Sequence, residues 1–195
     1  GAMAGVSAAY LAADGFTGAP AVTVNDPAVA PLWADLGKRW IILEQYFKPY
    51  PVCRWAHAAI DAALALRETH ALEGADVVEV RITSFANAVR LFAGMPATTS
   101  EAQYSLPFAV ACALVHGQIA LGHIEGDGLS DVRVARLVAA TTMVEDVRYE
   151  RRFPAERRAE VTLRLADGRV LDSGDTEARG GPTRPFDANA IAAKF

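Results

Sequence analysis

Five side chains suited to anion binding or proton transfer lie within a ten-residue stretch: Lys48, Tyr50, Cys53, Arg54 and His57. Ammonium and guanidinium groups hold carboxylates, and a histidine exchanges protons near neutral pH. A proline on each side of Tyr50 restricts the backbone, so these side chains are presented by a stiff segment. Their types and spacing predict a functional site.

Four of these five residues have two interpretations. Lys48 is a carboxylate clamp or proton donor, whereas a lone loop lysine would only be solvated. Arg54 either clamps a carboxylate or pairs with an acid across a domain interface. His57 is a general acid or base, or completes a structural hydrogen bond with Asp61, four residues later on the same helix surface. Cys53 is more consistent with a pocket-lining thiol than with a nucleophile, because no base is spaced to activate it.

The remaining chain supplies the elements that must position this site. We expect helices at 6–13, at about 26–36, from after Cys53 to residue 69 or 70, from 100 to 121 with a kink or break at Pro107, after Ser130, and after Asp187. We expect strands at 40–46, 77–85, 143–150, 159–168 and 169–178. The last two strands should form a hairpin at Asp167-Gly168. This order predicts an α+β fold, an antiparallel sheet covered on one face by the long helices.

Composition excludes several classes of protein. The 195 residues are 52% hydrophobic, enough for a substantial core, and 19 basic against 23 acidic residues leave no field that attracts nucleic acid or an anionic membrane. The sequence has no apolar run of about 20 residues that could cross a bilayer. Two distant cysteines indicate a reducing, cytoplasmic setting. Neither a zinc cluster nor a nucleotide fingerprint is present, so we expect no cofactor and no metal.

The stretch KPYPVCRWAHAAIDAAL resembles the corresponding block of the MmgE/PrpD family, which includes 2-methylcitrate dehydratases and cis-aconitate decarboxylase. Three further stretches resemble the family in the same order: GVSAAYLAADGFTGAP, TSEAQYSLPFAVACALVHG, and a closing pattern with GGPTRPFD and a final KF. Two positions depart from the decarboxylase branch. Cys53 stands where that branch carries a histidine, and Phe108 where it carries a tyrosine.

The resemblance implies a lyase that eliminates water or carbon dioxide from a small polycarboxylate, with an active-site role for Lys48. We assign Lys48 and His57 to catalysis, and Arg54, Tyr50 and Cys53 to substrate binding. A 2-methylcitrate dehydratase-like elimination without metal is the favoured reaction. The rival interpretation is a shortened, non-catalytic homologue that binds a carboxylate or a partner protein.

The resemblance also predicts how the chain is organised. We expect residues 1–3 to remain from an expression tag, and residues 4–195 to form one α+β lid domain. In the family an all-helical domain precedes this region and carries other catalytic groups, and the intact enzymes are homodimers. We therefore expect the isolated chain to be inactive.

Overall fold

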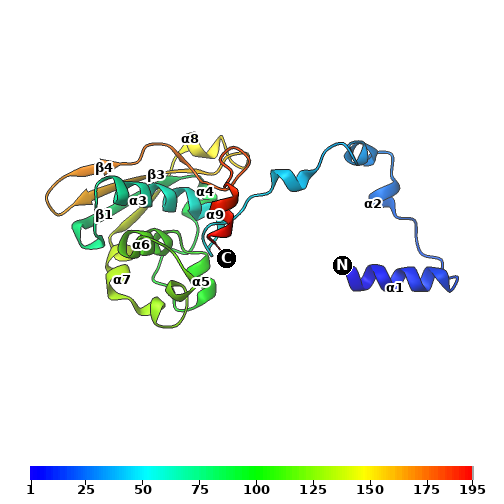
Figure 1. The fold of residues 1–195 in the computed structure, drawn as a ribbon, viewed down its shortest axis with the longest axis horizontal. Coiled ribbons are helices and arrows are strands. Elements are labelled where there is room, and N and C mark those ends of the chain that lie inside the picture. The colour runs from blue at the N-terminus through cyan, green and yellow to red at the C-terminus, as the bar shows by residue number, and fades with distance from the viewer. Residues whose placement is uncertain (195) are drawn as a thin grey trace. The chain divides into compact units, whose positions relative to one another are not determined.

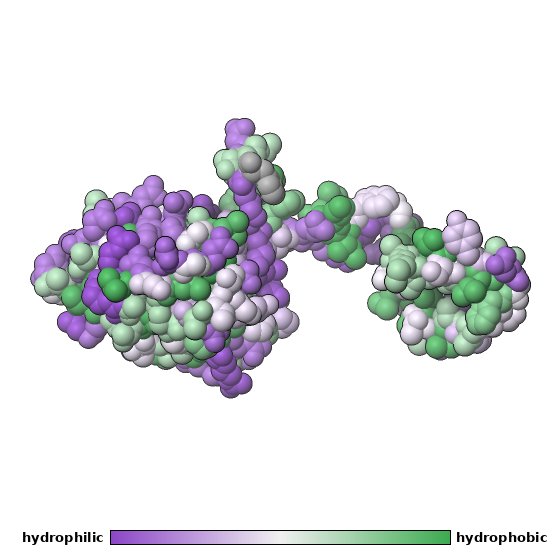
Figure 2. Space-filling view, turned by 90° about the horizontal axis from the view of Figure 1, so that it is seen from below, coloured by the Kyte–Doolittle hydropathy of each residue, from purple (hydrophilic) through white to green (hydrophobic). Residues whose placement is uncertain are grey.

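The computed structural model describes residues 1–194. The chain divides into two compact units, one of Gly1–Glu44 and one that begins at Gln45. The first unit contains two α-helices and two 3-10 helices: α1 (Ala2–Ala13), α2 (Val22–Asn25), η1 (Ala30–Trp33) and η2 (Ile41–Glu44). None of these elements has a buried residue. Figure 2 shows hydrophobic surface, drawn in green, over much of this unit. Among the described residues, no helix has the length and apolarity needed to cross a membrane.

The second unit contains the sheet and the helices that pack on it (Figure 1). Its elements in chain order are η3 (Arg54–Ala56), α3 (His57–Thr69), η4 (Gly74–Asp76), β1 (Val77–Ser84), α4 (Ala86–Val89), α5 (Thr99–Gln103), α6 (Leu106–His116), η5 (Leu121–His123), η6 (Gly126–Ser130), α7 (Val132–Ala139), β2 (Thr141–Glu145), α8 (Val147–Glu150), β3 (Arg158–Leu165), β4 (Val170–Asp172), β5 (Thr176–Glu177) and α9 (Ala188–Ala192).

The sheet has the strand order β2-β1-β3-β4, and β5 also pairs with β3. Strand β3 is antiparallel to β1, β4 and β5, with Ile82 opposite Val161 in the centre. Alternate residues of β3 are buried, as expected for a strand with one face on the core. Helix α3 packs on β3, α7 contacts β1, and α6 contacts both helices. The predicted α+β class is therefore confirmed.

One part of the predicted sheet is wrong: β2 runs parallel to β1, with Ile82 opposite Met143. The chain between these strands includes helices α6 and α7, and a long helical connection is what a parallel pair requires. The sheet is therefore mixed and not wholly antiparallel.

Several predicted elements are replaced by helices or turns. Residues 40–46 contain the 3-10 helix η2 and no strand, and the region 26–36 forms turns around η1. The predicted strand 143–150 ends at Glu145, because Asp146 caps α8 by accepting a hydrogen bond from the backbone N–H of Arg148 at 2.7 Å. The strand expected over 169–178 is split into β4 and β5 by a turn at Gly174. Helix α1 begins at Ala2 and not at residue 6.

The long helix predicted from residue 100 is divided into α5 and α6. Ser105 starts α6, since its hydroxyl accepts a hydrogen bond from the N–H of Phe108 at 3.3 Å. Pro107 occupies the first turn, where a missing N–H costs no helical hydrogen bond. Helix α6 ends at Gly117, whose φ of 69° suits the left-handed cap. Its nine buried residues make it the central core helix, as its uniform apolarity predicted.

Candidate functional site

The proline-rich segment before α3 is held in place by a loop from the far end of the chain. The backbone N–H of Phe47 donates to the carbonyl of Gly180 at 2.9 Å. Gly180 has a φ of +91°, and a Cβ atom there would lie 2.2 Å from the carbonyl oxygen of Phe47. Only glycine fits this approach, because it has neither the steric penalty at positive φ nor the colliding atom. The closing GGPTRPFD pattern therefore serves to position the KPYP segment.

His57 lies at the first position of α3 and is completely buried. Its Nε2 atom lies 3.1 Å from the carbonyl of Val52, so Nε2 must carry the proton. Its Nδ1 atom then accepts from the hydroxyl of Tyr46 at 2.8 Å. Burial lowers the pKa of His57 to about 4, and the positive charge of Lys48 adds to this effect. The ring is thus a neutral structural link without exposed surface, and its predicted catalytic role remains untested.

Asp61, one turn further along α3, is the centre of a buried hydrogen-bond network. The hydroxyl of Tyr50 donates to its carboxylate at 2.5 Å. The backbone N–H of Arg179 donates at 2.8 Å, and the guanidinium Nε and Nη2 atoms donate at 3.0 Å and 2.9 Å. The same Nη2 atom also donates to the Tyr50 oxygen at 2.9 Å. The predicted contact between His57 and Asp61 on the helix surface is wrong, because both residues are buried and their hydrogen bonds go to different partners.

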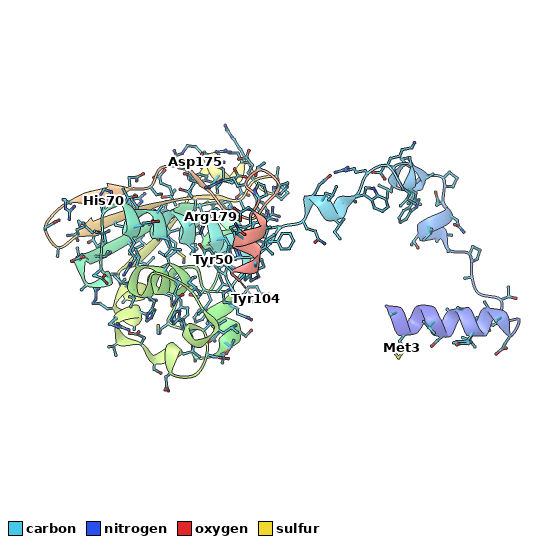
Figure 3. The ribbon with its side chains drawn as sticks, in the orientation of Figure 1. Met3, Tyr50, His70, Tyr104, Asp175 and Arg179 are labelled. Atoms are coloured by element: carbon cyan, nitrogen blue, oxygen red, sulfur yellow. The ribbon has the colours of Figure 1, made fainter. Side chains whose placement is uncertain are left out.

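Electrostatics in this network are consistent with a permanently charged Arg179. Burial alone lowers the pKa of Arg179, but the hydrogen bonds and negative charge of Asp61 outweigh it, and the pKa is raised overall. The pKa of Tyr50 is raised by burial and by the Asp61 charge, so the phenol stays protonated and donates to the carboxylate. Figure 3 shows Arg179 and Tyr50 beside α9.

Arg54 and Cys53 occupy the turn into α3. The Arg54 guanidinium stacks on the Tyr46 ring, 3.8 Å from the ring centroid, and its Nε atom is buried without a hydrogen-bond partner. Burial and the nearby charge of Arg157 lower its pKa. Arg54 forms no ion pair with an acid among residues 1–194. The Cys53 thiol is half-buried, and its backbone N–H donates to the carbonyl of Gln103 at 2.7 Å.

Lys48 is exposed and borders a concave surface of the second unit, a groove of about 290 Å³. We call this the Lys48 groove; its lining residues are Phe47, Lys48, Pro49, Arg179, Phe186, Ala190, Ile191, Ala193 and Lys194. Arg179 thus belongs both to the Asp61 network and to the groove wall. None of these lining residues is acidic. An anion in this groove would therefore meet no carboxylate side chain from the described lining residues.

Arg179 also borders a second groove, of about 330 Å³, with Leu64, Arg67, Glu68 and Gly117. Glu68 gives this groove an acidic wall. An anion entering it would meet a carboxylate, so the Lys48 groove is the better anion site.

The family can now be identified from a match over most of the chain. Residues 50–195 match the MmgE/PrpD C-terminal domain. The chain belongs to the MmgE/PrpD family. This is a family of dehydratase-like enzymes. No curated protein matches the chain.

The MmgE/PrpD match contains four of the five predicted site residues and begins two positions after Lys48. The structure brings Lys48 into one groove with Arg179. Tyr50 accepts a hydrogen bond from Arg179 and its ring contacts that of His57, whereas Arg54 stacks on Tyr46 and does not line the groove. Sequence reasoning missed the roles of Arg179 and Tyr46. Arg179 directly precedes the glycine pair of the closing MmgE/PrpD pattern, and that position was the available signal.

Proposed function

We propose that residues 4–195 belong to the lid domain of an MmgE/PrpD-type lyase, with the sheet in the unit that begins at Gln45, and that the Lys48 groove binds a small polycarboxylate. The observation that carries this proposal is the shared groove of Lys48, Arg179 and Lys194, which places three cationic residues, and no acidic one among the described lining residues, on a concave surface. Its volume of about 290 Å³ lies near the lower end of the range for small-molecule sites.

Lys48 is the candidate catalytic residue of this groove. An elimination next to a carboxylate needs a cation to hold the substrate and an acid to assist the leaving hydroxyl. The exposed ammonium of Lys48 can serve either purpose. His57, buried and neutral, acts in this proposal by fixing Val52 and Tyr46 around the Lys48 segment.

The reaction we favour is a 2-methylcitrate dehydratase-like elimination of water, in an enzyme whose helical domain supplies the other catalytic groups. The isolated 195-residue chain should then bind the acid but not turn it over. Production of an unsaturated acid from 2-methylcitrate by this chain alone would contradict the proposal that the helical domain supplies the other catalytic groups.

Binding is tested by calorimetric titration of the 195-residue chain with citrate, and by the rise in its melting temperature. A ligand at 100 times its dissociation constant stabilises the folded state by about 2.7 kcal/mol. Lys48→Ala should abolish the heat of binding and the thermal shift. Lys38→Ala, a lysine of the first unit, is the matched control and should leave both unchanged. Equal binding by wild type and Lys48→Ala would refute the proposal.

The alternative is a non-catalytic protein that binds a carboxylate or a partner. The observation that favours it is the partly exposed guanidinium of Arg54, because it forms no ion pair with an acid among residues 1–194 and could pair with a partner's carboxylate. An assay of dehydration by the chain joined to a helical domain of the family distinguishes the lyase from the non-catalytic protein. Turnover that depends on Lys48 supports the lyase.

A further inference from the structure

We infer that Arg179 is a specificity-determining residue that binds a second carboxylate of the ligand, and that Asp61 is the residue that positions it. This inference rests on the proposed function and extends it to a residue outside the KPYP block.

Arg179 has hydrogen-bond donors that no described residue uses. A guanidinium has five N–H groups. The Nε atom and Nη2 are engaged by Asp61 and Tyr50, whereas Nη1 makes no hydrogen bond with any residue in 1–194. The Arg179 side chain is 47% exposed, so this end of the guanidinium is accessible. Two N–H groups thus remain for a ligand.

Asp61 holds the Arg179 side chain in a fixed position. The Asp61 side chain is only 5% exposed, and its carboxylate binds both the guanidinium and the backbone N–H of Arg179. The side chain is therefore fixed before any ligand arrives, and less conformational entropy is lost on binding. A surface arginine without such a partner would lack this advantage.

The Lys48 groove combines cationic and apolar side chains. Lys48 supplies a positive charge for one carboxylate and Arg179 supplies another for the second, while Lys194, the other cation of the lining, donates to the backbone carbonyl of Lys48. The lining also includes the apolar side chains of Phe186 and Ile191, with the Phe186 ring centroid 5.9 Å from the guanidinium carbon of Arg179. This arrangement fits a short aliphatic acid that carries at least two carboxylates on a saturated chain.

The test is a comparison of three acids that differ in the number of carboxylates: tricarballylate with three, glutarate with two and butyrate with one. Wild-type chain should bind the first two about tenfold more tightly than butyrate, the effect expected from one charge-assisted interaction. The double variant Asp61→Asn/Arg179→Gln removes the positioned guanidinium without leaving a buried carboxylate unpaired. It should lose this tenfold preference and keep butyrate binding within about twofold. Arg184→Gln, in the same loop but outside the groove lining, should keep the preference.

The outcomes separate this inference from the proposed function. A double variant that keeps the tenfold preference overturns the role of Arg179, while the Lys48 groove still stands. If the wild-type chain binds none of the three acids, both the proposed binding of a polycarboxylate in the Lys48 groove and the proposed role of Arg179 are refuted.

If the double variant does not fold, NMR of the wild-type chain with labelled arginine side chains tests whether Arg179 contacts the ligand. The Arg179 side-chain resonance should shift saturably with tricarballylate, and the Arg184 resonance should not. An Arg179 resonance that stays in place while tricarballylate saturates the protein overturns the inference.

Discussion

Replacing Asp61 by alanine removes the acceptor of four hydrogen bonds, from the hydroxyl of Tyr50 and from three N–H groups of Arg179. Both donors would remain beneath the Lys48 segment without their charged partner. Removing one member of a buried ion pair costs roughly 3–5 kcal/mol. Because the Arg179 side chain is 47% exposed, water solvates part of the orphaned charge, and we expect the lower end, about 3 kcal/mol.

The loss should appear in urea unfolding followed by circular dichroism. With a urea dependence of about 2 kcal/mol per molar, the midpoint of Asp61→Ala should fall by about 1.5 M. The melting temperature should fall by roughly 6–12 °C, at 2–4 °C per kcal/mol for a chain of this size.

The control is Glu79→Ala, which removes the carboxylate of an exposed pair with Arg164 on the open face of the sheet. Exposed pairs contribute little, so its midpoint should stay close to wild type. If Asp61→Ala unfolds at the same urea concentration as Glu79→Ala, the Asp61 network does not stabilise the fold, and the argument that it positions Arg179 fails.

Three further predictions concern His57, Gly180 and the cysteines. Because the pKa of His57 falls from 6.5 to about 4 on folding, its stabilising effect is complete above pH 6.5 and is lost as the pH falls toward 4. His57→Gln should remove on the order of 2–3 kcal/mol of this pH dependence, measured as urea midpoints between pH 7 and pH 4; parallel curves for the two proteins would contradict the burial argument. Gly180→Ala should destabilise more than Gly168→Ala, because both glycines have φ near +90° but only the first would collide with Phe47; equal losses in thermal unfolding would exclude the collision as the cause. Burial raises the pKa of Cys112 to about 12, so only Cys53 should react with a thiol reagent while the protein is folded. Rapid reaction of both thiols would show that the core around α6 is accessible to the reagent.

Local signals were sufficient for much of the fold. The glycine after α6, the Asp167-Gly168 turn between β3 and β4, and Asp187 before α9 all mark element ends through backbone preferences that need no distant partner. The uniformly apolar run in α6 identified the core helix for the same reason. The prediction failed where local preference is weak: residues 40–46 contain β-forming side chains but have no strand beside them.

For the candidate site, the sequence by itself determined the chemistry of the KPYP stretch: a lysine on a stiffened backbone, followed at once by a buried helix. The tertiary structure decided which of its neighbours face a ligand. His57 is turned into the core, whereas Arg179, 118 residues after Asp61, is brought to the groove wall. Sequence spacing cannot reveal such a pair, because the contact depends on a glycine loop folding back onto the segment before α3. The partner of a buried carboxylate is chosen by the packing of the whole domain.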